Sequence, residues 1–399
     1  MTIRNPKAIK YFAKTNFRNK NKVFGIKTPL DSQYHTVLIS KTGSGKSNVL
    51  KSFIINDIEE NRPCAVIDCH GTLIDELKAL IPENRIKDVI DIDLGNVNLE
   101  VGYNPLRKVS ESKKSLVASG IVEILKRTVD SKSFGSKMEY ILFACIMAIL
   151  DMPGKRTFSD IIKILQDKKF RKTCVKHIKN EEVKLFFTEQ IKDYNPKFDF
   201  VPIYKLFNFL LHPTLKKLLV ENENSISLLQ AMDSKILLIR NAKGEIGQMA
   251  SQLIGNIFIT GISLAGFARL SIKEEDRIPF SLYIDEAANY CSDDNSSITS
   301  LFEELRKAKV QTYLVFPGLA SLHTKVRDAI MGNVGNLLVM RTDALTGTYL
   351  SKEMAKYHQP FTYEDFVLMP RFHMIVKIII DGQPALPFTC ISIVYKDYF

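Results

Sequence analysis

The sequence has little of three things: long apolar runs, closely spaced cysteines and segments of low complexity. Its longest apolar stretches, 141–150 and the interrupted run 253–268, fall short of the roughly 18–20 clean apolar residues that span a bilayer. The N-terminus has no continuous apolar stretch of the kind that forms the core of a secretory signal. We therefore expect no transmembrane helix and no secretory signal, and we expect a cytoplasmic protein.

The six cysteines stand apart from one another in the sequence. They are Cys64, Cys69, Cys145, Cys174, Cys291 and Cys390. They form no CxxC pair and have no histidine partner at zinc-binding spacing, so the pattern is typical of reduced thiols in a cytoplasm. We expect no metal site beyond an ion bound with a nucleotide.

The charge of the chain is positive and uneven. A formal net charge of +11 favours a polyanionic partner, either nucleic acid or an anionic membrane face. Residues 1–30, a basic N-terminal arm, contain no acid and hold Arg4, Lys7, Lys10, Lys14, Arg18, Lys20, Lys22 and Lys27. Three interpretations stay open: a solvated, partly disordered leader, an arm that touches DNA, or a membrane-surface anchor that uses Ile9, Tyr11, Phe12 and Phe17.

Strand and helix patterns alternate at both ends of the chain. Buried-strand patterns at 34–40, 63–68 and 89–92 alternate with helical patterns at 46–60 and 71–80. Strand patterns return at 235–240, 280–284, 311–316, 336–341 and 373–380, with helices at 245–270, 297–309 and 322–331. This alternation predicts an α/β fold with a largely parallel sheet covered by helices on both faces.

The middle of the chain has a different character. Between 110 and 227 the strand signals fade, while helical spacing continues through 116–129, 138–150, 158–165 and 203–219. We expect an inserted all-helical domain at 110–227, which divides the core into a first part at 31–109 and a second part at 228–399.

Residues 40–47, SKTGSGKS, fit the Walker A pattern except at the first position, where serine replaces glycine. The glycines let backbone N–H groups surround phosphates, Lys46 reaches the β- and γ-phosphates, and the Ser47 hydroxyl binds Mg²⁺. The strand before and the helix after this loop are the context that the mechanism needs. The residues expected to bind the nucleotide are Thr42, Gly43, Ser44, Gly45, Lys46, Ser47 and Asn48.

Two acids follow the apolar strand 280–284. Asp285 would stand at the end of that strand beside the phosphate loop, where it can hold the metal, and Glu286 can polarise the attacking water. Such a pair could also be a solvated turn, but together with a Walker A segment it predicts a Walker B site. The sequence therefore predicts ATP with Mg²⁺ as cofactors, and ATP hydrolysis.

Phosphoryl transfer also needs a positive charge near the γ-phosphate, which a neighbouring subunit of a ring commonly supplies. Arg306, on the helix predicted after the acid pair, is the first candidate for this catalytic arginine. The alternatives are Arg269, Arg277 and Arg341, and each could equally be a surface or pairing arginine.

Two further features could contribute to function. The turn 68–71, DCHG, ends a strand where open α/β sheets bind ligands, so it could contact the nucleotide or the next subunit, or be a plain capped turn. A basic cluster in the helical insert could meet DNA phosphates or be a solvated helix face. Its members are Lys168, Lys169, Arg171, Lys172, Lys176, His177 and Lys179.

An ordered series of segments over 24–390 resembles the HerA/FtsK superfamily, and within it the conjugative coupling proteins (TraG/TraD-like) and type IV secretion DNA-binding ATPases. The segments are HTVLISKTGSGKS at 35–47, VIDCHG at 66–71, YNPL at 103–106, KILLIRNAKG at 235–244, RIPF at 277–280, IDE at 284–286, LRK at 305–307 and IMGN at 330–333.

This resemblance implies a RecA-like core interrupted by an all-helical domain, a homo-hexameric ring, and ATP-driven movement of DNA through its pore. It assigns the trans-acting arginine finger to Arg306 and suggests relaxase or secretion-channel partners. The family's membrane-anchored members carry transmembrane helices that are not seen here, which implies a soluble form or one recruited to the inner face of the membrane. Pro317 stands where the family usually has a sensor glutamine.

The sequence thus predicts a DNA-translocating ATPase of conjugation or a related mobile-element process. Two alternatives stay open: an ATPase that packages a viral genome, and a secretion-system ATPase or nucleotide-dependent scaffold that acts on protein partners.

Overall fold

The computed structural model describes residues 9–16, 18, 20–107, 109–126, 134–291, 305–320, 322–354 and 361–394. The chain divides into two compact units. The first comprises residues 1–91, 228–242 and 265–399, and the second comprises 92–227 and 243–264. Each is described by itself below.

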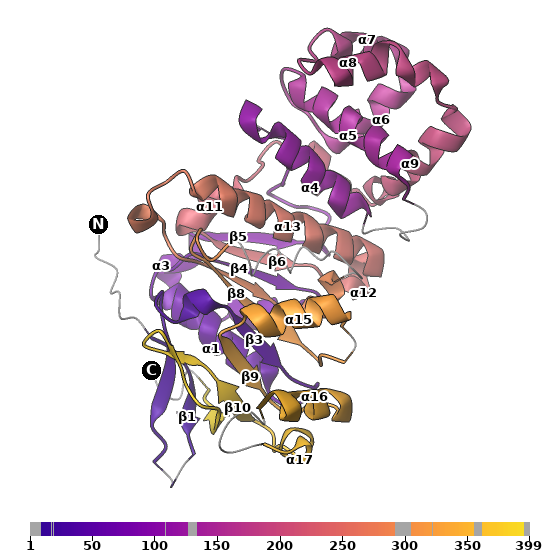
Figure 1. Cartoon of the computed structure of the whole chain (residues 1–399). Helices are drawn as coiled ribbons and strands as arrows, with labels where there is room; N and C mark the ends of the chain where they lie inside the picture. The colour runs from indigo at the N-terminus through magenta and orange to yellow at the C-terminus, as the bar shows by residue number, and fades with distance from the viewer. Residues whose placement is uncertain are drawn as a thin grey trace. The chain divides into compact units, whose positions relative to one another are not determined.

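The first unit is built on an 11-stranded sheet with the order β2-β1-β13-β10-β9-β3-β8-β7-β4-β6-β5 (Figure 1). The strands are β1 Ile9–Thr15, β2 Val23–Lys27, β3 Thr36–Ile39, β4 Cys64–Asp68, β5 Val89–Asp93, β6 Ile236–Arg240, β7 Phe280–Ile284, β8 Val310–Phe316, β9 Asn336–Val339, β10 His373–Lys377 and β13 Phe388–Ser392. A separate two-stranded sheet pairs β11 Ile379–Ile380 with β12 Gln383–Pro384.

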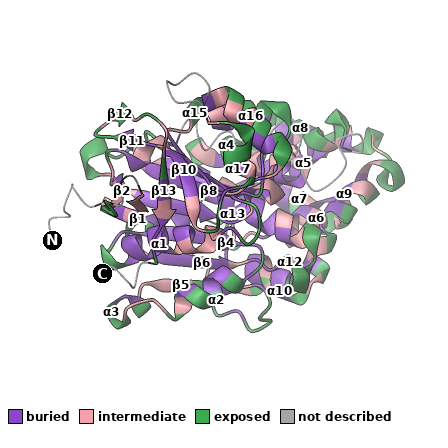
Figure 2. Ribbon diagram, turned by 90° about the horizontal axis from the view of Figure 1, so that it is seen from below, coloured by how far each residue is buried: buried purple, intermediate pink, exposed green. Residues whose placement is uncertain are grey.

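The central strands β9, β3, β8, β7, β4 and β6 are parallel, and the edge formed by β10, β13, β1 and β2 is antiparallel. Strands β3, β4 and β7 are buried at every position, which explains their largely apolar sequences (Figure 2). The predicted α/β class is confirmed, as a mixed sheet that is mostly parallel at its centre.

Helices of the first unit follow the strands. They are α1 Lys46–Glu59, α2 Thr72–Lys78, α3 Glu83–Ile86, α11 Leu228–Ser234, α15 Thr324–Asn333, α16 Ala344–Met354 and α17 Tyr363–Val367. Apolar side chains of α1 and α2 pack with those of the strands in one core cluster on one face of the sheet. Up to β6 each new strand is added on one side of β3, and from β7 to β9 the strands are added back in the other direction. A right-handed crossover therefore puts the connection from β8 to β9, which contains α15, on the opposite face.

The second unit is helical. Its helices are α4 Lys114–Lys126, α5 Ser136–Asp151, α6 Phe158–Gln166, α7 Lys168–Val175, α8 Glu181–Thr188, α9 Val201–Leu206, α10 Pro213–Lys216 and α12 Lys243–Ile246. Helix α13, Gln248–Arg269, runs through the boundary between the units. Local caps define several of these ends: Thr157 and Asp160 form a capping box on α6, and Asn180 caps α8.

The helical spacing found at 203–219 does not correspond to one continuous helix. The structure has the separate helices α9 and α10, because His212 takes an extended conformation (φ −76°, ψ 120°) before Pro213. A proline disfavours the helical region for the residue before it and has no N–H to continue the hydrogen-bond ladder. The helix predicted at 297–309 lies outside the described residues up to position 304, and residues 305–309 form turns.

Among the described residues, one helix, α13, has the length and apolar composition to cross a membrane. Of its most apolar 18-residue window, 72% is buried inside the structure, which is the behaviour of a core helix.

A solvated leader is the wrong description for residues 9–15 and 23–27. Strands β1 and β2 form an antiparallel pair, and β1 also pairs with β13, with Ala13 opposite Ser392. Phe12 and Ala13 are buried in the core cluster. The many lysines of this segment indicated a solvated arm, but one of them points into the protein.

That lysine, Lys10, is fully buried and holds several elements together. Its Nζ lies 2.8 Å from Asp57 Oδ2 on α1 and 2.9 Å from Ser281 Oγ on β7. Asp57 also accepts hydrogen bonds from Arg62 Nε and from the Tyr283 hydroxyl, each at 2.6 Å. We call these five residues the Lys10 cluster. Burial lowers the pKa of Lys10 to about 8, against the attraction of Asp57.

Candidate functional site

The site lies at the edge of the sheet where the parallel strands end. The loop after β3 is fixed to its neighbours by its backbone: Ser40 N–H donates to Phe316 O on β8 at 2.9 Å, and Lys41 N–H donates to Arg341 O after β9 at 2.8 Å. Asp285 N–H donates to Ile67 O on β4 at 3.0 Å. Strand β8 therefore separates the strand that leads into the glycine loop from the strand that leads into the acid pair.

The glycine loop 40–47 has the backbone that its sequence predicts. Gly43 (φ 81°) and Gly45 (φ 110°) take left-handed conformations that favour glycine. A Cβ on Gly45 would lie 2.6 Å from Cδ1 of Phe372, so only glycine fits there. Helix α1 begins at Lys46 and directs its first N–H groups into the loop, which makes an anion-binding position.

The other expected nucleotide-binding residues lie in or next to this loop with different surroundings. Thr42 and Gly43 are exposed, while Ser44 is buried, with its hydroxyl 3.5 Å from Arg341 O. Ser47 is half-buried in the first turn of α1. Asn48 is the exception, since its amide donates to Ile393 O at 2.7 Å and so anchors α1 to the chain after β13.

Lys46 bridges the glycine loop and the acid pair. Its Nζ lies 3.0 Å from Asp285 Oδ1 and 3.5 Å from Glu286 Oε1. The structure therefore brings together the lysine of the Walker A segment and both acids of the Walker B segment, which are about 240 residues apart in the sequence. The Lys46 side chain is 18% exposed and that of Asp285 9%, so this ion pair is largely shielded from water.

The local charge balance favours a further cation. Burial lowers the pKa of Lys46, but Asp285 and Glu286 raise it by more, so the net shift is upward and the ammonium stays charged. Burial, together with the charges of Asp68 and Glu286, raises the pKa of the Asp285 carboxyl despite Lys46. One ammonium thus faces several carboxylates, and a metal cation beside Asp285 would offset the remaining negative charge.

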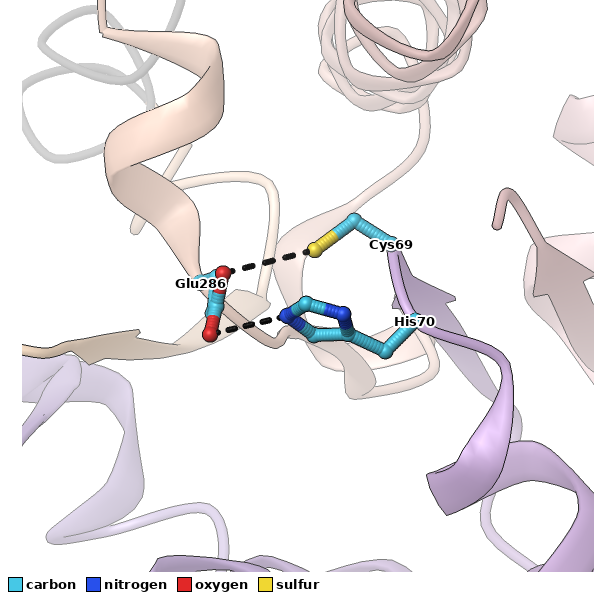
Figure 3. A group of neighbouring side chains, drawn as sticks. All are labelled: Cys69, His70 and Glu286. Atoms are coloured by element: carbon cyan, nitrogen blue, oxygen red, sulfur yellow. Dashed lines mark hydrogen bonds and ion pairs between the residues drawn. The ribbon is translucent and has the colours of Figure 1, made fainter. Parts of the chain in front are cut away.

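The turn after β4 contributes two more side chains. His70 Nε2 lies 2.9 Å from Glu286 Oε1, and Cys69 Sγ lies 3.8 Å from Glu286 Oε2 (Figure 3). Asp68 is buried and accepts from the N–H groups of His70 (2.8 Å) and Ile74 (3.1 Å), so it caps this turn and the start of α2. The capped-turn interpretation of the segment 68–71 is thus confirmed, and His70 also reaches the acid pair; contact of this turn with a nucleotide or the next subunit stays a prediction.

Glu286 itself has an unusual backbone. Its φ of 49° and ψ of 53° lie in the left-handed region, which few residues with a Cβ adopt. Such a conformation persists only where the surroundings enforce it, and it is found often at functional sites. Sequence reasoning did not find the contacts of Cys69 and His70 with Glu286, because they depend on β4 and β7 being neighbours in the sheet.

The four candidate arginines differ in position and in their contacts. Arg306 is exposed before β8, at the opposite edge of the sheet from the glycine loop, with its guanidinium carbon 4.1 Å from the ring centroid of Tyr34. The structure does not bring it to the chain's own Lys46. Arg269 is buried against Asp233, and Arg277 donates to backbone carbonyls around α13, so both have structural partners. Arg341 follows β9 beside the glycine loop.

Two other predicted features can be located. Pro317 follows β8 at the edge of the site and is exposed; its side chain has no hydrogen-bond donor. The basic cluster lies on and just after α7 in the second unit, where its members are exposed except Arg171. Arg171 donates to the carbonyls of Ile164 and Leu165 and holds the end of α6.

The fold and this edge define a RecA-like P-loop ATPase core. Comparison with solved structures agrees. The chain is similar to the bacterial conjugative coupling protein TrwBdeltaN70, with a TM-score of 0.67, 12% identity, and coverage of 93% of this chain and 87% of that one. It is also similar to TrwB in complex with ADP and Mg²⁺, with a TM-score of 0.65, 12% identity, and coverage of 92% and 87%.

A third similar structure is VirB4 of Thermoanaerobacter pseudethanolicus, with a TM-score of 0.60, 12% identity, and coverage of 98% of this chain and 96% of that one. No protein-family model and no curated protein matches the sequence. The resemblance to coupling proteins and type IV secretion ATPases that the motifs predicted is thus confirmed at the level of the fold.

Proposed function

We propose that this chain is an ATPase motor of conjugation or type IV secretion that moves DNA as a homo-hexamer. The observation that carries the ATPase part is the convergence of Lys46, Asp285 and Glu286 at the edge of the sheet, with Lys46 Nζ 3.0 Å from Asp285 Oδ1. The fold supports it, because TrwB, at 12–13% identity, has been solved with ADP and Mg²⁺ and with an ATP analogue.

The residues present fit Mg²⁺ with a nucleotide. Ser47 and Asp285 offer a hydroxyl and a carboxylate, the oxygen donors that Mg²⁺ prefers, and the excess of carboxylates over ammonium groups favours a cation. When bound, the ion neutralises charge on the phosphates. Lys46 would leave Asp285 and bind the β- and γ-phosphates, and N–H groups of the loop 42–47 would surround them.

Glu286 is the proposed acceptor of the water proton. Its carboxylate now contacts Lys46 and His70. Once Lys46 binds phosphate, the Glu286 carboxylate is released from one of these two contacts and can orient a water for attack. A neighbouring subunit would supply Arg306, since this arginine lies at the far edge of its own sheet.

The DNA part of the proposal rests on the net charge of +11 and on the exposed lysines of the basic cluster. The coupling-protein fold favours the same substrate. The partners would be DNA, further copies of the chain, and relaxase or secretion-channel proteins. The proposed location is the cytoplasm, with recruitment to the inner face of the membrane.

The test is ATP hydrolysis by the wild type and by Glu286→Gln, measured without DNA, with single-stranded DNA and with duplex DNA, at two salt concentrations. We expect DNA to raise the wild-type rate, less so at the higher salt, and Glu286→Gln to bind ATP but lose at least about 100-fold in rate. Replacement of Lys168, Lys169, Lys172 and Lys176 by glutamine should remove the DNA effect and keep the basal rate.

Two results would change the proposal. ATP hydrolysis at a rate that DNA does not change would support the ATPase activity but indicate that the motor acts on a protein partner instead of DNA. No hydrolysis at all would refute the motor and favour a nucleotide-dependent scaffold, for which Pro317 in place of a polar sensor side chain is the supporting feature.

A further inference from the structure

Three different metal-ligating side chains meet beside the proposed ATPase site. They are Cys69 and His70, consecutive residues after β4, and Glu286 after β7 (Figure 3). Their donor atoms, a thiol sulfur, an imidazole nitrogen and a carboxylate oxygen, all lie within 4.8 Å of one another. The sequence did not predict this group, because its cysteine and histidine are adjacent in sequence and the third donor is remote.

From this geometry we infer a binding site for a borderline-soft divalent cation such as Zn²⁺, formed by Cys69 Sγ, His70 Nε2 and Glu286. Zn²⁺ binds sulfur at about 2.3 Å and nitrogen or oxygen at about 2.0–2.2 Å in tetrahedral geometry. Those lengths put neighbouring ligand atoms roughly 3–4 Å apart. His70 Nε2 lies 2.9 Å from Glu286 Oε1, Cys69 Sγ lies 3.8 Å from Glu286 Oε2, and all three donors lie within 4.8 Å of one another, so modest side-chain movements complete the geometry.

The surroundings support a thiolate and hold the donors in place. The Asn289 amide nitrogen lies 3.2 Å from Cys69 Sγ and donates to it, which is the kind of outer contact that orients a metal ligand and stabilises negative charge on it. Cys69 is fully buried directly after the central strand β4, and Glu286 is held in its left-handed conformation. All three donors therefore come from ordered parts of the sheet edge.

The site is open on one side. The His70 side chain is 41% exposed and that of Glu286 is 23% exposed, so a cation has access from the solvent and a water can fill the fourth position. Binding replaces the proton of the Cys69 thiol by the metal and releases that proton, with no change of oxidation state. Oxygen-preferring Mg²⁺ is not suited to a sulfur and nitrogen donor set.

One neighbour opposes binding. Lys46 Nζ lies 3.5 Å from Glu286 Oε1, so its ammonium repels a cation on that carboxylate. This repulsion weakens when a nucleotide draws Lys46 to its phosphates. A bound cation would in turn engage the carboxylate that the proposed function uses as proton acceptor, so Zn²⁺ would switch hydrolysis off. This regulatory consequence rests on the proposed function, whereas the binding site itself does not.

Binding is tested on the full chain without nucleotide, with Co²⁺ as a spectroscopic probe and Zn²⁺ as its competitor. We expect one tetrahedral Co²⁺ with a thiolate-to-metal charge-transfer band, displaced by Zn²⁺. Cys69→Ser should abolish the band, and His70→Gln should weaken binding at least about tenfold. Cys291→Ser and His373→Gln serve as matched controls and should keep both the band and the affinity.

His70→Gln is at a partly exposed position, so it remains informative if Cys69→Ser destabilises the protein. A band that persists in Cys69→Ser, or equal affinity in His70→Gln and the wild type, would overturn the site. Hydrolysis is then measured with free Zn²⁺ set by a chelator buffer, relative to each variant's own metal-free rate. Metal binding without any ATPase activity would sink the proposed function alone, and hydrolysis without metal binding would sink the site alone.

Discussion

Replacing Lys10 by methionine tests whether the Lys10 cluster holds β1 to the rest of the sheet. Methionine keeps an unbranched stem of similar length and removes the ammonium group. The wild-type ammonium lies within 3.4 Å of four acceptors, on α1, β7 and β8. It also lies 4.4 Å from the ring centroid of Tyr313. The substitution therefore removes a charge that ties together strands from both ends of the chain.

The expected loss of stability follows from what remains around Asp57. Breaking a buried ion pair costs about 3–5 kcal/mol when the partner charge is left alone. In Lys10→Met, Asp57 would keep its hydrogen bonds from Arg62 and from the Tyr283 hydroxyl, each at 2.6 Å, so its carboxylate would still be paired. Losing a hydrogen bond to a charged group costs about 1.5–3 kcal/mol. We therefore expect Lys10→Met to lower the free energy of unfolding by about 2–4 kcal/mol.

Calorimetry and urea unfolding, followed on the transition of the first unit, measure this effect. At about 2–4 °C per kcal/mol, Tm should fall by on the order of 10 °C. Lys20→Met, on an exposed lysine between β1 and β2, is the matched control and should change little. The lowered pKa of Lys10 shows that desolvation of its ammonium opposes these contacts. A Lys10→Met protein as stable as the wild type would refute the reasoning, because the relief of that desolvation would then equal the cost of removing the contacts.

Three further predictions concern the same unit. Folding lowers the pKa of Lys10 from 10.5 to about 8, so between these pH values the unfolded state binds more protons than the folded state. The free energy of unfolding should therefore rise with pH across that window, and rise less in Lys10→Met. Urea unfolding at several pH values measures this. Gly45→Ala should abolish nucleotide binding and destabilise the unit by at least about 1 kcal/mol, since the methyl group would meet Phe372 at a positive φ; calorimetry with ATP measures both. Arg306→Ala should lower kcat about 1000-fold without raising the Kd for ATP. If the arginine acts in trans, mixing Arg306→Ala with Glu286→Gln subunits should restore activity. Restoration by Arg341→Ala instead of Arg306→Ala would assign the catalytic arginine to Arg341.

Much of the parallel core could be predicted from the sequence because its strands are buried on both faces. Runs such as 236–240 and 280–284 are almost purely apolar; the second has the predicted bounds, and the first begins one residue after the predicted strand 235–240. On the antiparallel edge, β10 lies within the strand predicted at 373–380, but β1, β2 and β13 were not predicted, for the opposite reason. Strand β1 mixes lysines with apolar residues, and composition alone cannot tell that Lys10 is buried while its neighbours in the sequence are partly exposed.

For the site, local sequence predicted single residues better than contacts. The loop 40–47 and the acids Asp285 and Glu286 carry their chemistry in short motifs, and the structure brings them together. The contact of His70 with Glu286 depends on strand order, which no local pattern encodes. Asn48 was also expected at the nucleotide, which stays a prediction; its side-chain amide donates to Ile393 O, in a segment almost 350 residues away, and no local pattern shows that contact.

The strand order also bears on how the protein is made. Strand β3, which leads into the glycine loop, has β8 and β9 as its neighbours, and His35 beside it contacts Thr312, 277 residues later in the chain. While the polypeptide emerges from a ribosome, both edges of β3 would thus remain unpaired until most of the chain has been synthesised. Unpaired apolar strands of this kind are prone to aggregate, so the nascent chain should depend on protection by chaperones over most of its translation, and fragments that stop before β8 should accumulate in inclusion bodies.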